Sequence, residues 1–238
     1  LPEGLQIVAV DLPGHGRSQH RGADAYYLFV EWVPIVFAIA DALGWKRFSL
    51  LGHSMGAGIS TLCAGTLPER IERMVLIEGL GPHSSPPADA PELLAKRLAE
   101  QSRLHQMRPR LYKSLELAIE VRRQQPNAQL EAHSARLIVE RGVVAEADGY
   151  RWTFDARLRA GSLTRLCEAS VIAFIERIAC PTLLIIAKGG WPFPAELVNR
   201  RVAALANGQV LELPGSHHLH LDTPEVVADP IGRFLVAG

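Results

Sequence analysis

The sequence has few cysteines, no long apolar run and no excess of charge of either sign. Its three cysteines, Cys63, Cys167 and Cys180, are widely spaced and lack metal-ligand spacing, so we expect reduced packing residues in a cytoplasmic protein. No stretch approaches the run of about 18 apolar residues that a transmembrane helix needs. The first residues also lack the basic start and apolar stretch of a secretory signal, so neither a membrane span nor secretion is expected.

The charge balance argues against two classes of partner. The 25 basic and 25 acidic residues give a formal net charge of zero, which provides no electrostatic attraction to nucleic acid or to an anionic membrane surface. Hydrophobic residues make up 48% of the 238 positions and charged residues 21%, which is typical of a globular protein with a sizeable core. The length fits one large domain, or a core domain with an inserted subdomain.

Segments of strand length alternate with segments of helical length near both ends of the chain. The expected strands are 5–11, 47–53, 73–78, 182–187 and 209–213. The expected helices are 26–43, 55–67, 194–206 and 223–236, of which the first and last contain Pro34 and Pro230 and should be kinked or distorted. This alternation predicts the α/β class, with a mostly parallel sheet flanked by helices.

The middle of the chain follows another pattern. Segments 91–107, 110–125 and 128–141 are charged and amphipathic, 163–178 is a further helix candidate, and only 149–154 suggests a short extended piece. We therefore expect a helical cap at 82–179, inserted between two core parts at 1–81 and 180–238.

The run Gly52-His53-Ser54-Met55-Gly56 directly follows an apolar strand and opens a helix, which is the context of a nucleophile elbow. Ser54 is the expected nucleophile, and the Met55 backbone N–H is an expected donor to a developing oxyanion. Side chains two residues on either side of Ser54 should collide in so tight a turn, which explains glycine at both places. The alternative is a glycine-rich turn without catalytic function.

A serine hydroxyl needs an imidazole to take its proton. The loop after the last predicted strand contains His217, His218 and His220, and it should emerge at the same sheet edge as the elbow. A zinc site is the alternative use of this cluster, but no carboxylate or cysteine is placed to complete it. His53 is set aside because its side chain should point away from Ser54.

A carboxylate should orient the imidazole and stabilise its charged form. The loop after strand 182–187 contains no acid, and Glu196 in the next helix has the position of an ordinary helix-start charge. Glu78 ends an apolar strand and precedes a glycine, so we take Glu78 as the triad acid. The alternative is a carboxylate that only caps a loop, with the triad incomplete.

Together these motifs resemble the α/β-hydrolase superfamily. DLPGHGRS at 11–18, GHSMG at 52–56, PTLLIIA at 181–187 and PGSHHLHLDTPE at 214–225 occur there in this order. Glu78 and the stretch WTFDARL at 152–158 make the chain most similar to the serine hydrolase-like branch. The resemblance implies Ser54 as nucleophile, His217 as base and the Met55 N–H as one oxyanion donor.

The resemblance also implies earlier strands and a His-Gly turn before residue 1, so the chain is expected to be N-terminally truncated. That turn would supply the second oxyanion donor, whose loss typically costs about 3–4 kcal/mol of transition-state stabilisation, or roughly a hundred- to thousandfold in rate.

The predicted reaction is hydrolysis of a carboxylic ester or related acyl compound, a small-molecule substrate, through an acyl-Ser54 intermediate, with no metal or organic cofactor. The expected lining residues of the substrate pocket are the large apolar side chains Met107, Trp152, Phe154, Trp191 and Phe193. Two alternatives stay open. The same triad could hydrolyse a carbon–carbon bond or catalyse perhydrolysis, or the fold could serve a non-catalytic binding protein.

Overall fold

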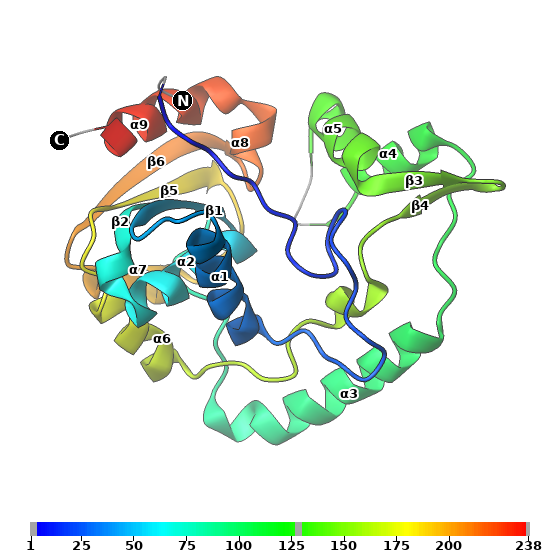
Figure 1. Cartoon of the computed structure of the whole chain (residues 1–238), viewed down its shortest axis with the longest axis horizontal. Helices are drawn as coiled ribbons and strands as arrows, with labels where there is room; N and C mark the ends of the chain where they lie inside the picture. The colour runs from blue at the N-terminus through cyan, green and yellow to red at the C-terminus, as the bar shows by residue number, and fades with distance from the viewer. Residues whose placement is uncertain (1–3, 127–129, 237–238) are drawn as a thin grey trace. The chain divides into compact units, whose positions relative to one another are not determined.

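The computed structural model describes residues 4–126 and 130–236, which form two compact units (Figure 1). The first unit holds the described parts of Leu1–Leu5, Phe29–Ala90 and Arg165–Gly238. The second holds Gln6–Leu28 and the described parts of Pro91–Thr164. The predicted cap at 82–179 overlaps most of the second unit, which also contains the segment from Gln6 to Leu28.

A four-stranded parallel sheet forms the centre of the first unit, in the order β1-β2-β5-β6. The strands are β1 Phe48–His53, β2 Ile71–Ile77, β5 Thr182–Gly189 and β6 Gly208–Ser216. The two central strands are almost continuously buried, as expected for a parallel sheet that is covered on both faces. The predicted α/β class with a parallel sheet is confirmed.

Helices of the first unit pack against both faces of this sheet. They are α1 Trp32–Ala42, α2 Met55–Thr66, α6 Glu168–Glu176, α7 Ala195–Ala203, α8 Leu219–Asp222 and α9 Pro224–Val236, with 3-10 turns at Phe29–Glu31, Pro68–Arg70 and Pro87–Asp89. One core cluster joins Ile77 and Ile185 to Ile231 and Phe234 of α9. On the opposite face Leu184 lines a cavity together with Leu197 of α7, because successive strand residues point to opposite sides.

The expectation of a buried strand at 5–11 was wrong. The segment forms no strand, and its apolar side chains Leu5, Ile7, Val8 and Val10 are between 39% and 62% exposed. A strand requires a hydrogen-bonded neighbour, and none of the strands in the described residues pairs with this segment. An apolar run indicates that a segment favours burial, but it does not show that a partner strand is present.

The two prolines differ in their position within a helix. Pro34 lies in the first turn of α1, which begins at Trp32, and its missing N–H would have had no helical acceptor there. Pro230 lies inside α9, which continues as one helix from Pro224 to Val236.

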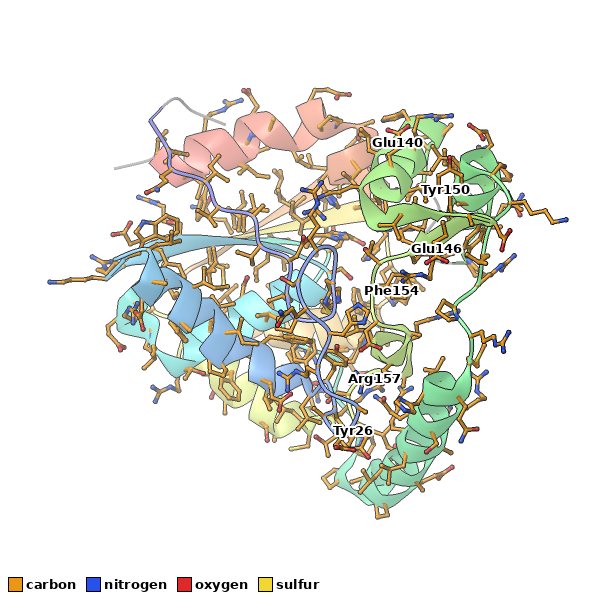
Figure 2. All side chains as sticks on the ribbon, turned by 45° about the vertical axis from the view of Figure 1, so that its right-hand side comes forward. Tyr26, Glu140, Glu146, Tyr150, Phe154 and Arg157 are labelled. Atoms are coloured by element: carbon orange, nitrogen blue, oxygen red, sulfur yellow. The ribbon has the colours of Figure 1, made fainter. Side chains whose placement is uncertain are left out.

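The second unit contains α3 Ala90–Gln106, α4 Leu115–Arg123, α5 Ala132–Gly142, the antiparallel pair β3 Val143–Glu146 and β4 Gly149–Trp152, and a 3-10 turn at Ala156–Ala160 (Figure 2). Residues 128 and 129 of the helix expected at 128–141 lie outside the described residues. The sequence indicated β4 but not β3. β3 begins directly after α5, and no turn residues separate the strand from the helix in the sequence. Among the described residues no helix is both long and apolar enough to cross a bilayer.

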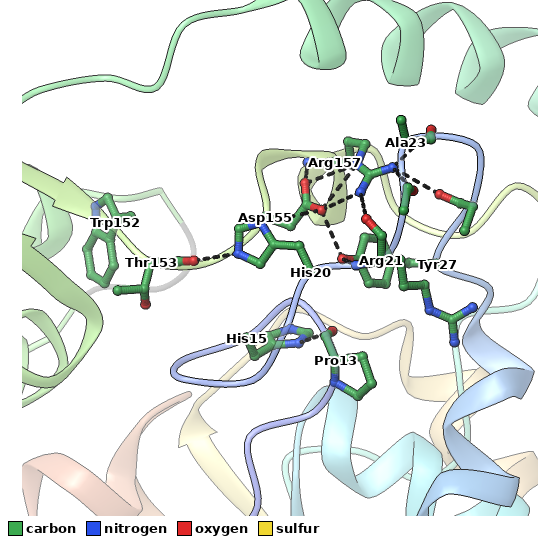
Figure 3. Close-up of polar contacts among 12 residues, drawn as sticks. Pro13, His15, His20, Arg21, Ala23, Tyr27, Trp152, Thr153, Asp155 and Arg157 are labelled. Atoms are coloured by element: carbon green, nitrogen blue, oxygen red, sulfur yellow. Dashed lines mark hydrogen bonds and ion pairs between the residues drawn. The ribbon is translucent and has the colours of Figure 1, made fainter.

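A buried ion pair fastens together distant segments of the second unit (Figure 3). The Arg157 guanidinium lies 2.7 Å from Asp155 Oδ2 and also donates to the carbonyl oxygens of four residues, Arg21, Gly22, Ala23 and Ala25. The Tyr27 hydroxyl donates to Asp155 at 2.9 Å. Burial raises the pKa of Asp155, but hydrogen bonds from Arg157 and Tyr27 outweigh burial and hold it below its usual value.

A second buried ion pair lies in the first unit. Arg201 of α7 is only 5% exposed, and it donates to both carboxylate oxygens of Glu168 on α6, at 2.9 and 2.7 Å. Its remaining nitrogen donates to the Leu80 carbonyl at 2.7 Å. The guanidinium therefore joins two helices to the segment that leaves β2, two residues after Glu78.

We expect Arg201→Met to lower the free energy of unfolding by about 3–5 kcal/mol, because it removes the buried guanidinium that donates to both Glu168 oxygens and to the Leu80 carbonyl. Arg200→Met is the matched control. Arg200 reaches the same carboxylate at 3.6 Å but is 56% exposed, so its loss should cost less than about 1 kcal/mol. Urea denaturation measures both variants, and equal losses would contradict the role given to Arg201.

Candidate active site

Ser54 lies at the tight turn between β1 and α2. Its backbone has φ 51° and ψ −110°, a conformation that L-residues rarely adopt and that costs about 1–3 kcal/mol. The Ser54 N–H donates to the Ile77 carbonyl at the end of β2, at 2.9 Å, and so ties the turn to the neighbouring strand. The strained turn is the local structure that the elbow motif predicted.

The two glycines of the elbow are not equivalent. A Cβ atom at Gly52 would overlap the backbone of Gly56 and Ala57, so glycine is required there. A Cβ at Gly56 would meet nothing within 4 Å. The expectation that both positions avoid a collision was therefore right for Gly52 and wrong for Gly56.

Glu78 follows β2 directly and is 3% exposed, with its backbone at φ 56°. Its Oε1 accepts a hydrogen bond from the Ala187 N–H at 2.7 Å, and its Oε2 accepts one from the Trp191 N–H at 2.8 Å. Gly190 leaves room for this carboxylate, because a Cβ there would overlap it. The end of β5 and the loop after it, which contain no acid of their own, instead supply backbone donors that orient the acid that follows β2.

His217 follows β6 and is 6% exposed. Its Nδ1 lies 3.0 Å from Glu78 Oε2, and its Nε2 lies 3.0 Å from Ser54 Oγ. Because a carboxylate can only accept, Nδ1–H donates to Glu78 and Nε2 is left to accept the serine proton. The structure thus brings the three predicted residues into one hydrogen-bonded chain, although they are separated by up to 163 positions.

The Met55 N–H occupies the first position of α2. The first N–H groups of a helix have no acceptor within the helix and lie at the positive end of its dipole. This position beside Ser54 is suited to a developing negative charge on a substrate oxygen.

His53 has a structural function that was not predicted from the sequence. Its ring Nε2–H donates to the His217 carbonyl oxygen at 2.7 Å. Burial and, to a smaller extent, the neighbouring His220 lower the pKa of His53 to about 3, so the ring is neutral. A histidine directly before the nucleophile, on a strand that ends at the site, was the available signal.

Two of the predicted lining residues lie beside the triad within the first unit. The Trp191 ring centroid is 5.3 Å from that of His217, and the Phe193 ring is 5.8 Å from that of His83. Both line a cavity of about 120 Å³ that also contacts Glu78. Neither Ser54 nor His217 lines this cavity, so of the three triad residues only Glu78 contacts it.

The other predicted lining residues belong to the second unit. Met107 follows α3 and is 49% exposed, and the Arg103 guanidinium reaches its sulfur. Trp152 ends β4 and stacks near Phe154, at 5.7 Å between ring centroids. Their contact with a substrate stays a prediction.

A profile of the alpha/beta hydrolase fold matches residues 1–224. The chain belongs to the α/β-hydrolase fold family. A serine hydrolase-like protein of Danio rerio is 30% identical over 99% of this chain and 74% of its own length. A serine hydrolase-like protein of Dictyostelium discoideum is 28% identical over 98% of this chain and 68% of its own. The predicted likeness to the serine hydrolase-like branch is confirmed.

A solved structure is also similar to this chain. The crystal structure of a hypothetical protein from Pseudomonas aeruginosa is 40% identical and superposes with a TM-score of 0.89. The match covers 98% of this α/β-hydrolase and 82% of the other chain.

The two elbow glycines allow a direct test of the turn. We expect Gly52→Ala to lower the free energy of unfolding by about 1–3 kcal/mol, since the added methyl group overlaps the start of α2. Gly56→Ala adds the same methyl group to open space inside a helix, where alanine is favoured, and should leave stability equal or higher. Urea denaturation compares the two, and an equal loss for both would show that the turn is packed differently.

Proposed function

We propose that this α/β-hydrolase cleaves a carboxylic ester of a small molecule through an acyl-Ser54 intermediate. The observation that carries the proposal is the hydrogen-bonded chain from Ser54 Oγ through His217 to Glu78. A buried carboxylate, an imidazole with one nitrogen on each partner and a serine on a strained turn together form a nucleophile with its base.

Each residue has one task in this reaction. Ser54 Oγ attacks the carbonyl carbon while His217 Nε2 takes its proton, and Glu78 stabilises the resulting imidazolium. The Met55 N–H donates to the carbonyl oxygen as it becomes negative. His217 then protonates the leaving alcohol, and the acyl group stays on Ser54.

The second half of the reaction uses the same groups. His217 takes a proton from water, which attacks the acyl carbon and releases the acid from Ser54. The Trp191 ring beside His217 gives this site an apolar wall and favours a substrate with an apolar or aromatic acyl group.

Two features favour a catalytic function over a binding function. The backbone is strained at both Ser54 and Glu78, and the Glu78 carboxylate is buried, which reduces stability. Ser54 and Glu78 each form a hydrogen bond to one nitrogen of His217. A receptor that only bound ligand through the same fold would gain nothing from them.

The nucleophile is tested by labelling with a fluorophosphonate probe, followed by turnover of p-nitrophenyl esters. We expect the unaltered chain to be labelled at Ser54 and Ser54→Ala to remain unlabelled, with ester hydrolysis reduced by roughly 10⁴-fold or more. An unaltered chain that is folded yet neither labelled nor active would end the proposal, as would equal labelling of Ser54→Ala.

The acid is tested by Glu78→Gln, which keeps the volume but removes the charge that stabilises the imidazolium. We expect kcat to fall by roughly 10³- to 10⁴-fold with little change in KM, because the charge acts mainly in the transition state. Glu196→Gln is the matched control, since Glu196 is an exposed carboxylate in the first turn of α7. If both variants kept full activity, Glu78 would be only a loop cap.

A further inference from the structure

Three histidines outside the triad gather next to it. The ring nitrogens that His53, His218 and His220 offer all lie within 4.8 Å of one another. The His53 ring centroid is 4.1 Å from that of His220 and 5.2 Å from that of His218. His53 comes from the end of β1 and the other two from the start of α8, so the sheet topology brings the three together.

The hydrogen bonding of two of these rings suits metal ligation. His53 donates its Nε2–H to the His217 carbonyl, which leaves the lone pair of the neutral ring on Nδ1. Metal-binding histidines usually donate the second ring nitrogen to a carbonyl or carboxylate in this way. His220 Nδ1 is buried and has no hydrogen-bond partner within the described residues. A buried ring nitrogen without a partner is unfavourable unless something binds it.

From this arrangement we propose that His53, His218 and His220 form a binding site for a transition-metal ion of the Zn²⁺ class. Imidazole nitrogen is a preferred ligand of Zn²⁺, Ni²⁺ and Cu²⁺ and a poor one for Mg²⁺. Zn–N bonds of about 2.0–2.1 Å in a tetrahedral shell place ligand atoms about 3.4 Å apart, so small rotations of the rings complete the site. Water would occupy the fourth position.

A metal ion bound at this site should affect ester hydrolysis, an expectation that rests on the proposed function. The His217 ring centroid lies 4.7 Å from that of His53 and 5.0 Å from that of His218. The ion would bind the ring of His53, whose Nε2–H holds the His217 carbonyl oxygen at 2.7 Å. Its binding should therefore shift the position of the base and inhibit hydrolysis reversibly.

Binding is measured first, by isothermal titration calorimetry with ZnCl₂ on chain purified without a polyhistidine tag. We expect one Zn²⁺ per chain, no binding of Mg²⁺, and affinity at least about tenfold weaker in His218→Ala and His220→Ala. His105→Ala removes an exposed histidine from α3 and should bind like the unaltered chain. His220→Gln is measured as well, in case the alanine variant does not fold.

Inhibition is measured second, as the Zn²⁺ concentration that halves the ester turnover of each variant relative to its own metal-free rate. We expect that concentration to rise at least about tenfold in the cluster variants, and EDTA to restore turnover of the unaltered chain. Absence of Zn²⁺ binding, or binding that every cluster variant retains, would overturn the site. Binding without any ester turnover would uphold the site and count against the proposed function alone.

Discussion

The arrangement of the site depends on the carboxylate of Glu78 and on the three N–H groups that donate hydrogen bonds to it. One comes from the backbone of Ala187 near the end of β5, one from the backbone of Trp191 in the loop after β5, and the third is Nδ1–H of His217 after β6. One side chain thus connects the ends of three adjacent strands of a parallel sheet. A carboxylate buried to 3% exposure is stable only when its oxygens are satisfied, so the loops around it are held in the geometry that satisfies them.

Other features of the first unit support the same point. Arg201 fixes the segment that follows Glu78 through the Leu80 carbonyl, and Gly190 allows the next loop to approach the carboxylate. On the other side of His217, the Ser54 N–H is bound to the end of β2. The nucleophile and the acid are therefore both anchored to β2, and His217 spans the distance between them. The strain at Ser54 and Glu78 is balanced by these contacts, as is usual at functional sites.

His53 links the triad to the proposed metal site. Its ring bonds the backbone of His217, and it contributes the ligand that the loop at 217–220 lacks on its own. The sequence disfavoured a metal site because no carboxylate or cysteine is placed to complete one at that loop. The third histidine comes instead from a strand more than 160 positions earlier, which only the order of strands in the sheet brings close.

The sequence by itself determined the parallel α/β class, the elbow at Ser54 and the candidate base and acid, because each leaves a local mark. Alternating strand and helix lengths, a glycine at position 52 and an acid at the end of an apolar strand are readable without coordinates. Tertiary structure alone decided that residues 5–11 form no strand, that Gly56 has open space and that His53 supports His217. Those outcomes depend on which segments become neighbours in space, and strand pairing, steric overlap and hydrogen bonding between distant segments exist only once the chain has folded.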